Sequence, residues 1–170
     1  MASTINVSLQ TLITQQALAS GVPPSIALAV AQKESSVSQW NPDGSLVTGT
    51  SGEVGVFQLM PKTAAAYAPD GTGADVNANI AGGISLLAAL YQKYGDWTKA
   101  LSAYNSGSPT GAPSYANSVL ATAASVGSIV SPVAAADVTV EDPGTASGMS
   151  TPVVVGLILG GIALAWWALD

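Results

Sequence analysis

The sequence contains no cysteine and no histidine, and its four basic residues are all lysines. These absences exclude a Ser–His–Asp triad, a cysteine nucleophile, disulfides and the usual zinc ligands. Charged residues make up only 8% of the chain and the net charge is -6, so the basic surface that nucleic-acid binding needs is also missing. The chemistry must therefore use carboxylates, hydroxyls, amides and backbone groups, and we expect no metal, no cofactor and no nucleic-acid partner.

Residues 1–124 carry helical signals separated by short turns. Apolar residues recur at helical spacing, prolines stand where helices can begin, and no alternating pattern indicates a strand. The pattern predicts helices over residues 8–20, 25–35, 61–68, 78–94, 96–105 and 112–125. This part of the chain is therefore predicted to be a mainly α domain.

Two further parts follow the helical domain. Residues 125–151 are rich in Ala, Ser, Gly, Pro and acids, with few large apolar residues, which predicts a flexible linker. The stretch at 153–169 has no charge, and at about 1.5 Å per residue a helix there spans about 25 Å. We therefore predict a transmembrane helix over 152–169, with Trp166 and Trp167 at a lipid interface. The spacing of Gly156 and Gly160 would allow two such helices to self-associate, although Gly-rich segments often contain this spacing by chance.

The acid Glu34 stands at the end of an unusually apolar run, IALAVAQKES. On a helix, Val30 and Ala31 lie one turn before it and Ala27 lies two turns before it, so the acid continues an apolar face. A carboxyl desolvated in this way has a raised pKa, which suits a proton donor near neutral pH. The alternative is an ordinary solvated glutamate at a frayed helix end.

The motifs that follow Glu34 form an ordered series. ES at 34–35 precedes NP at 41–42, GEVGVFQLMP at 52–61, NIAGGISLLAALYQKYGDW at 79–97 and ALSAYNSG at 100–107. From about residue 20 to 121 the chain resembles the lytic transglycosylase domain of the soluble transglycosylase and goose-type lysozyme group. The resemblance implies a compact, lysozyme-like helical domain with a groove for the glycan strands of peptidoglycan.

In that family the glutamate of the ES motif performs the proton transfers, so the resemblance assigns this role to Glu34. The carboxyl would protonate the oxygen that links N-acetylmuramic acid to N-acetylglucosamine. It would then act as base on the muramic acid 6-hydroxyl, leaving a 1,6-anhydro end. The substrate's acetamido group can stabilise the positive anomeric carbon, so a second carboxylate is dispensable.

The resemblance also implies a set of substrate-binding residues. Gln58 and Met60 would line the groove, Gly55 would let backbone approach the sugar, and Tyr104 would hydrogen-bond Glu34 or stack near the cleaved bond. Asn105 and Ser35 complete the set, although Ser35 can equally bond locally. Tyr91 and Tyr115 are expected to pack or to line the groove rather than to take part in the chemistry.

The chain departs from the family pattern beside the glutamine motif. Phe57 replaces a methionine, and the stretch between Glu34 and Gln58 is longer than usual. Where many members have a serine, this chain has Gly49, so a helper hydroxyl is not assured. Glu53 replaces a residue that is usually small. It is either a surface acid or a possible second acid that activates water, which would make the enzyme a lysozyme-type hydrolase.

The cellular location has to be inferred from the two ends of the sequence. The opening residues, MASTINVSLQTLITQQ, lack the basic start and long apolar run of a secretory signal. We therefore expect a membrane-anchored phage protein that is carried in the virion and acts in a virion membrane or the host envelope during genome entry. A tail-anchored bacterial envelope enzyme is the competing location. A non-catalytic glycan-binding module and a membrane structural protein are the competing functions.

Overall fold

The computed structural model describes residues 2–129, with side chains from Leu9 to Val126. Within this range all the regular secondary structure is helical, and the only β pairing consists of isolated bridges among residues 40–59. The helices are α1 (Ala2–Ala19), α2 (Pro24–Ser35), α3 (Pro61–Tyr67), α4 (Val76–Tyr94), α5 (Trp97–Ser106) and α6 (Pro113–Ile129). The predicted mainly α architecture is confirmed for these residues. The last helix continues past the predicted domain end at 124.

The predicted transmembrane helix at 152–169 and most of the predicted linker at 125–151 lie outside the described residues. Gly156 and Gly160 lie outside them too. None of the helices within residues 2–129 is both long enough and apolar enough to cross a bilayer.

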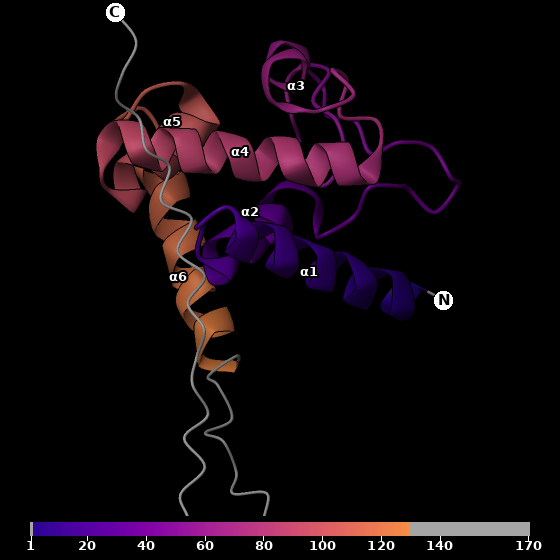
Figure 1. Cartoon of the computed structure of the whole chain (residues 1–170), viewed down its shortest axis with the longest axis horizontal. Helices are drawn as coiled ribbons and strands as arrows, with labels where there is room; N and C mark the ends of the chain where they lie inside the picture. The colour runs from indigo at the N-terminus through magenta and orange to yellow at the C-terminus, as the bar shows by residue number, and fades with distance from the viewer. Residues whose placement is uncertain (1, 130–170) are drawn as a thin grey trace, which may run out of the picture. The chain divides into compact units, whose positions relative to one another are not determined.

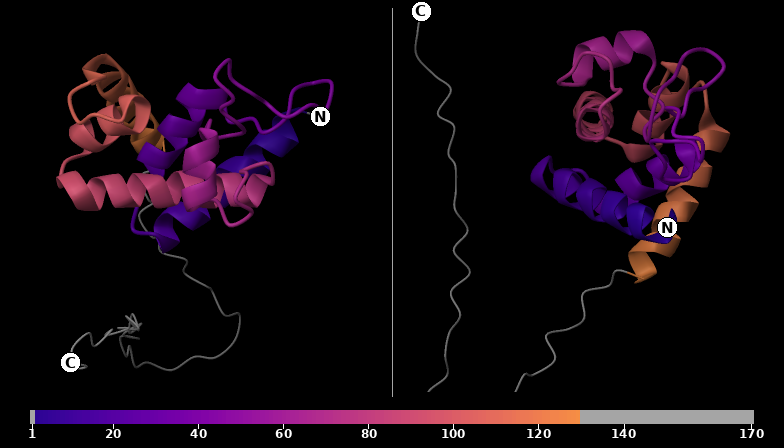
Figure 2. Two further views of the ribbon diagram at one scale, coloured as in Figure 1. Left: turned by 90° about the horizontal axis from the view of Figure 1, so that it is seen from above. Right: turned by 90° about the vertical axis from the view of Figure 1, so that its right-hand side faces the viewer.

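The helices pack around α4 and α2. Helix α4 contacts α3, α5 and α1, while α2 contacts α1 and α6, and α5 contacts α6 (Figure 1). Figure 2 shows the same arrangement from two further sides, with α3 and α1 on opposite sides of α4. The end of α2 and the start of α6 are therefore brought together, although they are far apart in the sequence.

Local sequence signals set the helix boundaries. Pro24 begins α2 and Pro61 begins α3, at positions where a missing backbone N–H costs nothing. The Asp75 side chain caps α4 by accepting hydrogen bonds from the N–H groups of Asn77 and Ala78. Helix α4 then ends at Gly95, which has a left-handed φ of 66°.

The segment that joins the long loop after α2 to α3 contributes Val56, Phe57 and Leu59 to the core. Phe57 in this segment is completely buried against α4. A Cβ atom added at Gly83 would lie 2.2 Å from the Phe57 ring, and one at Gly82 would lie 2.9 Å from Leu59. The two glycines of the NIAGG sequence thus let the segment approach the helix closely.

Candidate active site

Glu34 occupies the last turn of α2, where the chain leaves the helix through two left-handed residues. Ser36 has φ 56° and Val37 has φ 58°, and the Val37 N–H donates to the Ala31 carbonyl at 3.1 Å. The preceding turns of α2 are buried through Ala27, Val30 and Ala31 among others. This ending fixes Glu34 at the edge of the core instead of on a frayed helix end.

The Glu34 carboxyl is partly buried and has one specific hydrogen-bond partner. Tyr115, in the first turn of α6, donates its hydroxyl to Glu34 Oε1. Burial is the largest effect on this carboxyl and raises its pKa above the ordinary value of 4.5, while the Tyr115 bond acts in the opposite direction. The site therefore favours the protonated acid.

Two charged groups also act on Glu34. The negative charge of Glu53 raises the pKa of the Glu34 carboxyl, and the positive charge of the adjacent Lys33 lowers it. The predicted possible second acid is therefore within electrostatic range of Glu34. Its carboxylate accepts a hydrogen bond from the Ser51 N–H at 2.9 Å.

Gln58 lies in a tight turn, residues 54–59, which we call the glutamine turn. Val54 and Leu59 exchange two backbone hydrogen bonds of 3.0 Å, and the turn between them begins with Gly55 at φ 73° and ends with Gln58 at φ 44°. The Gln58 Nε2 donates back to the Gly55 carbonyl at 2.8 Å. A non-glycine residue in the left-handed region is strained, so the surrounding structure must hold it there.

Two buried side-chain amides form hydrogen bonds to the backbone of the glutamine turn. Gln39 Oε1 accepts from the Val56 N–H at 2.9 Å, and Asn79 Oδ1 accepts from the Phe57 N–H at 2.8 Å. Asn79 Nδ2 also donates to the Val54 carbonyl at 2.8 Å. Both amides donate as well to the carbonyl of Gly73, in the loop before α4.

The two amides explain why residue 55 is a glycine, without the approach of a sugar that we predicted there. Gly55 is buried, and a Cβ atom there would lie 2.4 Å from Gln39 Oε1 and 2.5 Å from Asn79 Nδ2. The glycine is needed because the two amides occupy the space that a side chain would take. The structure thus gives Gly55 a role in building the turn, while its predicted role in sugar binding stays a prediction.

Ser35 and Tyr104 bind the outward carbonyls of the same turn. The Ser35 hydroxyl donates to the Val56 carbonyl at 2.8 Å, and the Tyr104 hydroxyl donates to the Phe57 carbonyl at 2.7 Å. Tyr104 does not donate to Glu34, the bond that we expected as one possibility, but it lies close enough for the Glu34 charge to raise its pKa, after the larger effect of burial. Helices α2 and α5 thus each hold the glutamine turn beside Glu34 through one hydrogen bond.

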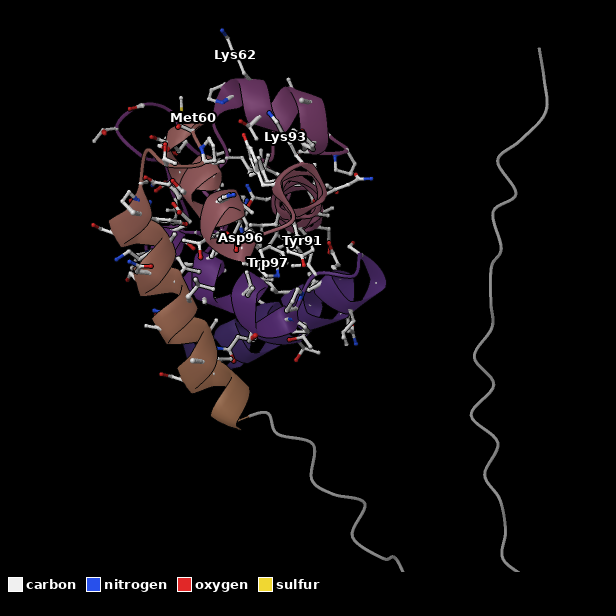
Figure 3. The ribbon with its side chains drawn as sticks, turned by 90° about the vertical axis from the view of Figure 1, so that its left-hand side faces the viewer. Met60, Lys62, Tyr91, Lys93, Asp96 and Trp97 are labelled. Atoms are coloured by element: carbon white, nitrogen blue, oxygen red, sulfur yellow. The ribbon has the colours of Figure 1, made fainter. Side chains whose placement is uncertain are left out.

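The other predicted residues are more exposed. Met60 is 42% exposed directly before α3, and Figure 3 shows it on the outer side of the domain near Lys62. Asn105 is exposed on the last turn of α5. Tyr91 stacks on Trp97 with ring centroids 4.4 Å apart, which is the packing role that we predicted for it.

Among the hollows on the surface of the described residues are two of about 460 and 480 Å³. One lies beside α4 near Ser85 and Gln92, and the other beside the loop near Asp70 and Asp75. Neither is lined by Glu34, so the glycan groove beside Glu34 stays a prediction. Among the same residues no group of three acids or other ligands is placed to hold a metal ion.

Sequence reasoning underestimated three residues of the site. Tyr115 was assigned to packing or to the groove wall, yet it is the direct partner of Glu34. Gln39 and Asn79 received no role, although a buried asparagine on an otherwise apolar stretch of α4 is a usable signal for a buried hydrogen-bond network. No comparable signal marks Gln39.

A partly buried carboxyl with a raised pKa, at a helix end and hydrogen-bonded to a tyrosine beside the glutamine turn, defines a site for acid–base cleavage of a polar bond. The family model for the transglycosylase SLT domain matches residues 11–117. The chain therefore belongs to this family, and the predicted lytic transglycosylase domain is confirmed.

Among solved structures, the chain is similar to the 70 kDa soluble lytic transglycosylase SLT70 from Escherichia coli. The identity is 30% and the TM-score is 0.47, over 67% of this chain and 18% of that one. The chain thus corresponds to less than a fifth of that protein. No curated protein sequence matches.

Proposed function

We propose that this protein cleaves the β-1,4 bond between N-acetylmuramic acid and N-acetylglucosamine in peptidoglycan and leaves a 1,6-anhydro end. The observation that carries the proposal is the state of Glu34, a partly buried carboxyl whose pKa is raised by burial and whose Oε1 accepts a hydrogen bond from Tyr115. The match to the transglycosylase SLT domain supports peptidoglycan as the substrate.

The reaction needs only one carboxyl because each step leaves it in the form that the next step uses. Protonated Glu34 gives its proton to the glycosidic oxygen as the bond from that oxygen to C1 breaks, and the substrate's acetamido oxygen stabilises the positive C1. Ionised Glu34 then takes the proton of the 6-hydroxyl while O6 bonds to C1. The carboxyl is thereby protonated again, and no water is consumed.

The surrounding residues position this proton. Tyr115 fixes the orientation of one carboxyl oxygen, so the other oxygen is the one left for the sugar. Gln58 and Met60, with Asn105 on α5, are the side chains that we propose contact the glycan. Ser35 and Tyr104 act by holding the glutamine turn at its place beside Glu34.

The test is digestion of purified sacculi by the full chain and by Glu34→Gln. Since general acid catalysis contributes about 100- to 10,000-fold, the variant should release soluble glycan at least about 100-fold more slowly than the wild type. Asp43→Asn, at an exposed turn, is the matched carboxyl-to-amide control and should retain wild-type release.

Mass spectrometry of the released fragments separates the remaining candidates. Anhydro ends support the proposal, whereas reducing ends would identify a lysozyme-type hydrolase. Binding of sacculi without any release by the wild type would identify a non-catalytic glycan-binding module.

We further propose that the domain is anchored in a lipid membrane through residues 152–169, as part of a phage virion that opens the cell wall during genome entry. The uncharged apolar sequence of 153–169 supports the anchor, as does the presence of Trp166 and Trp167 near its end, since tryptophan is enriched at lipid interfaces. The full chain should float with lipid vesicles, and it should be found in purified virus particles. A chain confined to bacterial envelopes would instead favour the tail-anchored enzyme.

A further inference from the structure

The Glu53 side chain is folded back over its own loop, residues 49–53. Its backbone carbonyl accepts a hydrogen bond from the Gly49 N–H at 2.7 Å, and its Oε2 accepts one from the Ser51 N–H at 2.9 Å. The side chain is partly buried. The Gly49 bond closes the backbone of residues 49–53, and the Ser51 bond holds the carboxylate over this loop, unlike a freely solvated surface acid.

Gly49 provides the space in which this carboxylate lies. A Cβ atom added at Gly49 would be 2.3 Å from Glu53 Oε2 and 3.0 Å from Gln58 Oε1. Gly49 does not have a positive φ, so its backbone conformation is open to any residue. The glycine is therefore required for space: without a side chain at 49, the Glu53 carboxylate can lie next to Gln58.

The turn that contains Gln58 is bonded to Ser35, the residue next to Glu34, through the Val56 carbonyl at 2.8 Å, so the Glu53 carboxylate beside Gln58 belongs to the same site as the Glu34 carboxyl. The groups that act on the Glu34 carboxyl are Tyr115, Glu53 and Lys33, and Tyr104 lies within electrostatic range of it. Of the charged groups, Lys33 favours the ionised form of Glu34 and Glu53 favours the protonated form. Glu53 therefore opposes the loss of the catalytic proton as the pH rises.

We propose that Glu53, seated in the space left by Gly49, is a second carboxylate of the active site that acts through Glu34 and sets the upper pH limit of cleavage. This inference rests on the proposed function. It makes Glu53 a residue that tunes the general acid, and no bond to Glu53 forms or breaks. Gly49 and Glu53 work as one unit because the carboxylate has no place beside Gln58 when position 49 carries a side chain.

The test is a carbon-13 NMR titration of the Glu34 carboxyl in the full chain and in Glu53→Gln, assigned with Glu34→Gln. Removal of the Glu53 charge should lower the midpoint for Glu34, because a like charge that disfavours the ionised form is lost. In the pH dependence of sacculus digestion, the loss of rate at high pH should begin at a correspondingly lower pH. Glu53→Asp, which keeps the charge, should restore part of the shift.

A second variant tests the spatial half of the proposal. Gly49→Ala should displace the Glu53 carboxylate and lower the midpoint for Glu34 in the same direction as Glu53→Gln. In a Glu53→Ala background, Gly49→Ala should cause no further shift because the clash is gone. Near-UV circular dichroism checks that each variant is folded.

An unchanged Glu34 midpoint in folded Glu53→Gln would overturn the inference. Loss of reducing-end products in Glu53→Gln without a change in midpoint would overturn it too, in favour of an acid that activates water. A wild type that releases no glycan would contradict the proposed function. The titration needs no turnover, so it would still test the inference in that case.

Discussion

At the scale of single residues, the account depends on how one carboxyl keeps its proton. The apolar turns of α2 bury Glu34 and the left-handed pair Ser36 and Val37 ends the helix directly after it. The burial could be predicted from sequence because Val30 and Ala31 are one helical turn away. Its Tyr115 partner could not, since the two residues are 81 positions apart and meet only because α6 packs on α2.

Glu34→Gln should stabilise the folded protein, and the gain should grow with pH. The folded-state pKa of Glu34 is raised above its unfolded value, so the native state binds more protons and stability falls as pH rises through the window between them. The neutral amide avoids this loss and can still accept the Tyr115 hydroxyl. Urea unfolding should show little difference between the two proteins below about pH 4 and a larger one at pH 8. A constant difference across this range would contradict the assignment of a shifted pKa to Glu34.

Tyr115→Phe should move the activity profile in the direction opposite to Glu53→Gln. The Tyr115 hydrogen bond lowers the pKa of Glu34, so its removal should shift the high-pH loss of activity upward. Because the carboxyl also loses its orientation, the rate at the optimum should fall by about tenfold or more.

Tyr104→Phe is the matched control for this variant, because its hydroxyl binds the Phe57 carbonyl instead. It should cost about 1 kcal/mol of stability and leave the pH profile in place. A Tyr115→Phe enzyme with wild-type rate and profile would show that this bond has no part in the chemistry.

At the scale of structural elements, the glutamine turn is held by hydrogen bonds from three helices. Ser35 from α2, Asn79 from α4 and Tyr104 from α5 all bond to its backbone, and Gly82 and Gly83 let α4 approach it. The order of the motifs predicted that these segments belong to one site. The direction of each hydrogen bond could not be predicted, because a motif records residue types and not which neighbour a side chain faces.

Asn79→Ala should cost about 3 kcal/mol or more of unfolding free energy. It would leave the buried Phe57 N–H and Val54 carbonyl without the side chain that pairs them, at about 1–3 kcal/mol each. The strained Gln58 should also lose its place, so sacculus digestion should slow beyond what unfolding explains. Exposed Asn77→Ala on the same helix is the control and should change stability by less than about 0.5 kcal/mol. Equal stability of the two variants in urea would show that the amide does not support the turn.

Gly49 and Gly55 show why the role of a glycine is hard to predict from sequence. Gly55 was expected to face a sugar, and Gly49 was noted only for the lack of a hydroxyl. In the fold, Gly55 leaves space for the amides of Gln39 and Asn79, which are distant in the sequence. Gly49 leaves space for the carboxylate of Glu53, whose side chain folds back over the loop. Such space exists only after the loop has closed.

At the scale of the whole molecule, the family match and the site lie in the same unit. Helices α1 to α6 belong to a compact unit over Met1–Pro132, and the matched residues 11–117 fall within it. The proposed anchor at 152–169 follows it in the chain. In the proposed arrangement the helical domain would perform the cleavage and the segment at 152–169 would decide where it takes place.

The central claim is that one carboxyl performs both proton transfers and that no water enters the product. Digestion of sacculi by the full chain in heavy-oxygen water, followed by mass spectrometry of the new glycan ends, tests it most directly. The account predicts 1,6-anhydro ends without the heavy label, formed by the wild type and not by Glu34→Gln. Reducing ends that carry the label, or equal yields from both proteins, would contradict it.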